Sequence, residues 1–178
     1  MSKTNDFLFK VLIVIAWIIF IGLCIEAGGL IVNFIFSIYN PEFVQNLYQK
    51  LDLSEMYKQH KWAFFSMYSF ILVISILKAV LFYVVIKLVS NIDLSKPFSD
   101  FASKQILHIS YYTLSIGLFS HVARQSAKTV AHHGMATENL NQFWEDSQAF
   151  ILMAAIIYII AIIFKKGIEL QNENDLTV

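Results

Sequence analysis

Apolar residues along this chain gather in four blocks, and the segments between the blocks carry most of the charged residues. The blocks cover residues 11–36, 62–89, 104–127 and 145–166. Each has the length of about 20 residues that an α-helix needs to cross a hydrocarbon layer of about 30 Å. The third block is the most polar, because serines, a threonine and a histidine interrupt it. The pattern predicts an all-α membrane protein, a bundle of four transmembrane helices in a single domain over residues 1–178.

The distribution of cationic residues predicts the orientation of this bundle. An even number of spans puts both termini on one side, and cytoplasmic segments of membrane proteins carry an excess of Lys and Arg. Seven cations lie on the side of the termini, against five on the other side. The first group is Lys3, Lys10, Lys87, Lys96, Lys104, Lys165 and Lys166, and the second is Lys50, Lys58, Lys61, Arg124 and Lys128. We therefore expect both termini in the cytoplasm.

The first outer loop carries the signature of a short amphipathic helix. Asn40 is a good N-cap, Pro41 suits a first helical turn, and Glu42 suits the positive end of a helix dipole. Behind them an apolar stripe recurs at helical spacing, made of Phe43, Val44, Leu47, Tyr48 and Leu51. This helix is expected to lie on the outer membrane surface or to cap the bundle.

Turn residues set the other helix boundaries. Pro97 ends any helix on the cytoplasmic side, and Ser99 is an N-cap for a helix that begins at Asp100. Gly134 marks a stop in the second outer loop, and Thr137 precedes a restart. Helices three and four are therefore expected to project beyond the hydrocarbon on the outer side.

Composition narrows the class of protein further. The chain is 57% hydrophobic and 15% charged, against about 45–50% and about 25% for a typical soluble domain. Its 13 Lys and Arg are matched by 13 Asp and Glu without a basic run, which argues against direct binding of nucleic acid. The single cysteine, Cys24, lies inside the first block and has no partner for an intrachain disulfide.

Two charged residues lie well inside the apolar blocks, Glu26 in the first and Lys78 in the second. A charge at the bilayer centre costs about 2.5–3.5 kcal/mol on insertion scales, so each requires a partner or a loss of charge. Counted from the cytoplasmic ends of their helices, Glu26 lies about 10 Å beyond Lys78, and side-chain tilt narrows this gap. His121 lies level with Glu26, and Arg124 is one turn farther.

Three alternatives stay open for these residues. Glu26 pairs with Lys78, or it pairs with His121 or Arg124, or it is protonated or faces water. An ion pair would fix the register of two helices, and it could also serve transport or sensing.

Small polar residues share single faces of the predicted helices, among them Asn33 in the first block and Ser110 and Thr113 in the third. Lipid is as apolar as leucine, so close packing and interhelical hydrogen bonds must hold membrane helices together. We expect these residues in the interior of the bundle.

No motif indicates catalysis, a cofactor or a metal site. The outer side carries several groups that could bind a metal, namely His121, His132, His133, Glu145 and Asp146. Their spacing does not match a helical ligand pair, because adjacent histidines point apart on a helix. The chain also lacks a nucleophile elbow and a phosphate-binding glycine loop. We expect a protein that is not an enzyme.

Two segments resemble a known family. The loop Ile86–Asp93 with Lys96–Ser99, and above all the tail Gly167–Val178, are similar to the bacterial membrane proteins called domain of unknown function 2975. The resemblance implies a multi-pass protein of the bacterial inner membrane with four spans and no established activity. It also implies a partner, because members are often encoded beside small Cro/repressor-like regulators. The long helical outer loop expected here departs from many members.

The residues and the resemblance together suggest two functions. The tail 167–178 is acidic, with Glu169, Glu173 and Asp175, and it could hold a small basic helix-turn-helix protein in a regulatory role. The alternative is a small transporter or channel subunit that uses Glu26 and Lys78 inside the membrane. That alternative requires a homo-oligomer or a polar cavity, since four helices make a thin bundle.

Overall fold

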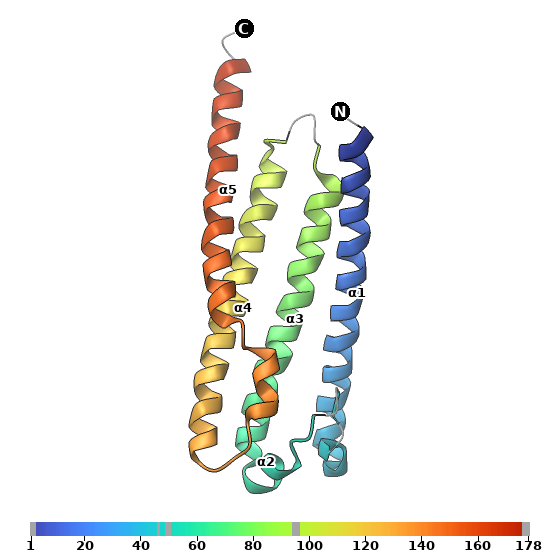
Figure 1. Ribbon diagram of the computed structural model, residues 1–178, viewed down its shortest axis with the longest axis vertical. Helices are drawn as coiled ribbons and strands as arrows, with labels where there is room; N and C mark the ends of the chain where they lie inside the picture. Colours follow the sequence, from blue (N-terminus) through green and yellow to red (C-terminus); the bar gives the residue numbers. More distant parts are fainter. Residues whose placement is uncertain (1–2, 46, 49–50, 94–96, 176–178) are drawn as a thin grey trace.

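A computed structural model describes residues 3–45, 47–48, 51–93 and 97–175. Four long helices run side by side, and the first begins at the end of the molecule where the last one ends (Figure 1). They are α1 (Lys3–Tyr39), α3 (Lys61–Asn91), α4 (Asp100–His132) and α5 (Ser147–Asp175). Three short elements lie at the opposite end, called here the loop end: η1 (Pro41–Gln45), α2 (Ser54–Gln59) and η3 (Glu138–Phe143). The long helices contain the first three predicted blocks, and α5 contains the fourth from Ser147 onward.

Three segments of the described chain are long and apolar enough to cross a membrane: Phe7–Tyr39, Lys61–Asn91 and Glu138–Glu173. They contain α1, α3 and α5, so the chain has the character of a membrane protein. Helix α4 is not among them, because the polar residues of the third block lower its hydropathy. The polar side chains of α4 therefore depend on cover from the two helices beside it, α3 and α5.

The four long helices of the predicted bundle form an open row. Helix α1 packs against α3, α3 against α4, and α4 against α5. Within the described ranges, α1 makes at most marginal contact with α4 and with α5. The reason lies in the side chains, since α4 has buried positions for two neighbours whereas α1 is exposed along most of its length. Helices α1 and α5 therefore form the two edges of the row.

Small residues let α4 and α5 approach closely. A Cβ atom added at Gly117 of α4 would lie 2.7 Å from Cγ1 and 2.9 Å from the backbone nitrogen of Ile151 on α5. The Ser110 hydroxyl donates a hydrogen bond of 3.0 Å to the carbonyl oxygen of Ala154 across the same interface. Buried small residues recur every seven positions on α5, at Ser147, Ala154 and Ala161. Close packing of this kind is the usual source of helix association in lipid.

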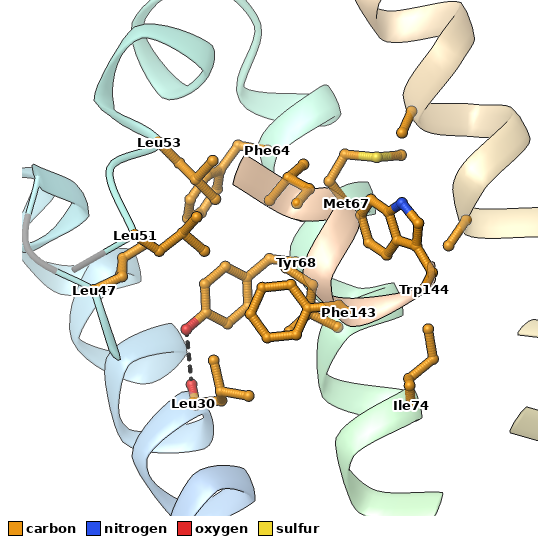
Figure 2. Close-up of a cluster of buried hydrophobic side chains, with 14 of the residues drawn as sticks. Leu30, Leu47, Leu51, Leu53, Phe64, Met67, Tyr68, Ile74, Phe143 and Trp144 are labelled. Carbon is orange, nitrogen blue, oxygen red and sulfur yellow. Dashed lines mark hydrogen bonds between the residues drawn. The ribbon is translucent and has the colours of Figure 1, made fainter. Parts of the chain in front are cut away.

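The largest buried cluster lies at the loop end, where short elements cover α3 (Figure 2). Phe64 and Tyr68 of α3 are fully buried, and Trp144, which follows η3, is 1% exposed. The Tyr68 hydroxyl donates a hydrogen bond of 3.1 Å to the carbonyl oxygen of Leu30, which ties α3 to α1. This end of the molecule therefore has a core like that of a soluble protein.

The prediction of one amphipathic helix in the first loop is wrong. The segment forms the 3-10 helix η1 and then folds back, with the Leu47 amide donating to the Leu51 carbonyl oxygen at 3.0 Å. A separate helix, α2, follows at Ser54–Gln59. Val44, Leu47 and Leu51 are nevertheless buried, because the fold-back turns their side chains into the cluster of the loop end. The segment thus caps the helix ends, and the Phe43 side chain lies outside the described residues.

Most of the predicted boundaries match the structure. The Ser99 hydroxyl accepts a hydrogen bond of 3.2 Å from the Ala102 amide, which confirms the N-cap of α4. Gly134 has a φ of +82°, in the left-handed region where glycine is favoured, and stops α4. The restart after Thr137 is the 3-10 helix η3, and its N-cap side chain makes no capping hydrogen bond.

The close approach at Gly117 gives the first prediction. Gly117→Ala should lower the free energy of unfolding in detergent by about 1–3 kcal/mol, because the added methyl group overpacks the α4–α5 interface. Gly28→Ala on α1 is the matched control, since a Cβ there meets nothing within 4 Å and should not destabilise the protein. Equal midpoints of thermal unfolding for the two variants would contradict the packing of α4 on α5.

Candidate functional site

The two intramembrane charges do not meet in an ion pair. Glu26 of α1 and Lys78 of α3 are both partly buried. Among the described residues, no ion pair within 4.0 Å joins Glu26 to Lys78, His121 or Arg124. The last two lie on α4, which α1 hardly contacts. The alternative in which Glu26 is protonated or faces water stays a prediction.

Two of the smaller polar residues predicted inside the spans, Ser110 and Thr113, donate hydrogen bonds within the protein. Asn33 of α1 is partly buried. Ser110 and Thr113 of α4 are buried, and the Thr113 hydroxyl donates a hydrogen bond of 2.7 Å to the carbonyl oxygen of Ile109 in its own helix. Ser110 bonds across to α5. The polar face of α4 is therefore part of the packing between helices.

The residues near the loop end that could bind a metal do not gather. His121, His132 and His133 are exposed. Within the described part of the chain, no three side chains of His, Cys, Asp or Glu come together as a metal site. The structure therefore offers no arrangement of these groups from which metal chemistry can be argued.

At the end where α5 stops, the α3–α4 loop is fixed to α5. The Phe98 ring of the loop lies 5.3 Å from the Phe164 ring of α5, measured between centroids. The same ring covers Gly167, where an added Cβ would lie 2.5 Å from Phe98 Cδ1. Ser99 then caps α4 directly after this contact. The loop and the end of α5 thus form one surface, the loop–tail surface, made of Pro97, Phe98 and residues 164–173.

The loop–tail surface carries charges of both signs and an exposed apolar residue, since Lys165 and Lys166 precede Glu169 and Glu173. Leu170 is 66% exposed. It lies beside Glu169 and near Glu173, which is one helical turn beyond Glu169. Lys166 forms an ion pair of 2.5 Å with Glu169. Both side chains are exposed, so this pair contributes little stability. An exposed leucine between Glu169 and Glu173 offers an apolar contact on the side of the surface that lies beyond the lysine pair 165–166.

The structure describes only part of the predicted tail. Glu169 and Glu173 lie on α5, which continues as a helix to Asp175. The Asp175 side chain and residues 176–178, as well as Lys96 of the loop, lie outside the described residues. Sequence reasoning missed the contact of Phe98 with Gly167. The signal for it was a glycine directly after the lysine pair 165–166, at a position where the helix otherwise has no need of one.

Comparison with known proteins identifies a family but no activity. The family model described as protein of unknown function (DUF2975) matches residues 47–178. The match includes α2, α3, α4, α5 and the whole loop–tail surface, and it leaves out α1. No curated protein and no solved structure matches the chain.

The absence of a Glu26 ion pair gives the second prediction. Glu26→Gln and Lys78→Met should each change the free energy of unfolding by less than about 1 kcal/mol, because neither substitution breaks a contact between charges. Loss of one partner of a buried ion pair costs about 3–5 kcal/mol. Thermal unfolding in detergent separates the two cases.

Tyr68→Phe is the positive control for this experiment. It removes the hydrogen bond to Leu30 and should cost about 1 kcal/mol, so the assay must detect it. If Glu26→Gln destabilised the protein by several kcal/mol, Glu26 would have an ionic partner that the structure does not contain.

Proposed function

We propose that this chain, which belongs to the family of proteins of unknown function DUF2975, is a four-span membrane protein that regulates a cytoplasmic partner. In this proposal both termini lie in the cytoplasm of a bacterial cell, and the loop–tail surface holds a small helix-turn-helix regulator of transcription. The protein has no enzymatic activity of its own.

Support for four spans comes from the position of α4 between α3 and α5. A helix that is covered by protein on two sides can be more polar than a helix that faces lipid. Its length of 33 residues corresponds to about 50 Å, more than the hydrocarbon thickness of about 30 Å. An even number of spans also agrees with α1 beginning and α5 ending at the same end of the molecule.

The observation that carries the proposed partner is the contact of Phe98 with Gly167 and Phe164. It holds Phe98 against the end of α5, so a partner can contact Phe98 and α5 together on one platform. Beyond the lysine pair 165–166 the tail carries Glu169, Glu173 and Asp175, and this acidic end of the chain favours a basic partner through electrostatic complementarity. A DNA-binding module is basic because it neutralises phosphates, so binding here would compete with DNA.

Transport has less support in the helix row. Two apolar grooves of about 390 and 400 Å³ run along it, one between α3 and α5 and one between α1 and α3. Neither Glu26 nor Lys78 lines either groove. A relay through these two charges would need a polar path, and no observation favours one.

Charge reversal on the platform tests the proposed partner. Glu169→Lys with Glu173→Lys should lower co-purification of a helix-turn-helix protein encoded beside this one by at least about tenfold, or about 1.4 kcal/mol in binding. Both side chains are exposed, so the helix should be retained. Glu55→Lys with Glu138→Lys is the control, because it makes the same charge change at two exposed positions of the loop end.

Phe98→Ala is the second arm of this experiment. It frees the loop from α5 while it leaves both carboxylates in place, and it should also weaken partner binding. Full recovery of the partner with the double reversal would refute the role of Glu169 and Glu173 in partner binding. Full recovery with Phe98→Ala would refute the role of the loop.

A further inference from the structure

A polar pocket of about 240 Å³ lies between α4 and η3 at the loop end, far from the loop–tail surface. Its α4 wall has two cationic residues, Arg124 and Lys128, with the small residues Ala127 and Ala131 between and beyond them. The facing wall is Thr137, Asn141 and Glu145. The pocket exists because alanines stand where larger side chains would fill the space between α4 and η3.

The charges of this pocket are separated and do not neutralise one another. Arg124 and Lys128 are one helical turn apart, a spacing at which like charges repel. Glu145 lies across the pocket, and no ion pair within 4.0 Å joins it to either cation among the described residues. Thr137 is 9% exposed, and no hydrogen bond of its hydroxyl occurs within the described chain. The site thus presents two positive groups, one negative group and neutral hydrogen-bonding groups to a common space.

The size of the pocket selects a compact ligand. It is much larger than the share of about 30 Å³ that one water molecule takes in the liquid. It is also smaller than the clefts of about 300–1,000 Å³ that hold drug-sized molecules. A small group that carries an anion at one end and a cation at the other would fill the pocket and pair with both walls.

The depth of the pocket indicates the source of this group. Arg124 is 24 residues beyond Asp100, or about 36 Å along α4, which is just past a hydrocarbon layer of about 30 Å. Tyr39 and Trp62 at the same end of α1 and α3 are 83% and 88% exposed. Aromatic residues of this kind gather at the level of the lipid headgroups. In the proposed topology the pocket therefore faces the headgroup layer.

We propose that this pocket binds the phosphoethanolamine headgroup of a membrane phospholipid. The phosphate lies between Arg124 and Lys128, and the ammonium group donates to the Glu145 carboxylate. A headgroup with only negative charge satisfies the cations but is repelled by Glu145. A choline headgroup has no N–H to donate to it. The inference rests on the proposed topology and is independent of the cytoplasmic partner.

Lipid titration of the full chain in detergent tests this site. Phosphatidylethanolamine should raise the thermal unfolding midpoint at lower concentration than phosphatidylglycerol or phosphatidylcholine with the same acyl chains. Arg124→Gln with Lys128→Gln should weaken this effect at least tenfold, whereas Lys58→Gln, an exposed cation outside the pocket, should not. Glu145→Gln should abolish the preference for phosphatidylethanolamine over phosphatidylglycerol and leave phosphate binding in place.

Three results would overturn the proposal. One is an unchanged response of the Arg124/Lys128 double variant, and another is equal responses of the wild-type protein to all three lipids. The third is an equal response to soluble phosphoethanolamine, which would make the ligand a free phosphate ester. The double variant should still co-purify the cytoplasmic partner, so failure of the lipid site and failure of the proposed regulatory function are distinguishable.

Discussion

The polar face of α4 can enter a membrane only while α3 and α5 cover it, and the order of the helix row follows from this constraint. Buried hydroxyl groups such as that of Ser110 need partners from protein, because lipid offers none. Gly117 lets α5 come close enough to provide them. The apolar helix α1 needs no such cover, and in the described chain α3 is the long helix against which it packs closely. The result is a row with a polar middle and edges suited to lipid.

The two ends of the row are packed differently, and we assign them different roles. At the loop end, short elements bury Trp144 and Phe64 in a core that fixes the helix ends and leaves a charged pocket beside η3. At the other end the described residues form no such core. The contact of Phe98 with Phe164 joins the loop to α5 there. One end therefore carries the pocket proposed for a lipid headgroup, and the other carries the loop–tail surface proposed for a cytoplasmic partner.

Helix positions could be predicted from the sequence, because hydrophobic length and turn chemistry at Ser99 and Gly134 are local signals. The open row could not, since it depends on which side chains from distant segments fit, as Gly117 fits Ile151. The apolar stripe around Leu47 is compatible with an amphipathic helix and with a segment that folds back on itself, because both arrangements bury the same residues. Counting residues along a helix gives the depth of a side chain but not the side of the helix on which it lies. The count therefore suggested ion pairs for Glu26 that the structure does not form.

The membrane crossing of α4 is the claim on which the account depends, and cysteine labelling tests it most directly. In a Cys24→Ser background, Asp100→Cys and Ala136→Cys place one thiol near each end of α4, at exposed positions. An impermeant maleimide should label Ala136→Cys in intact cells and Asp100→Cys only after the membrane is permeabilised. If both thiols react in intact cells, or both only after permeabilisation, α4 does not cross the membrane and the account is wrong.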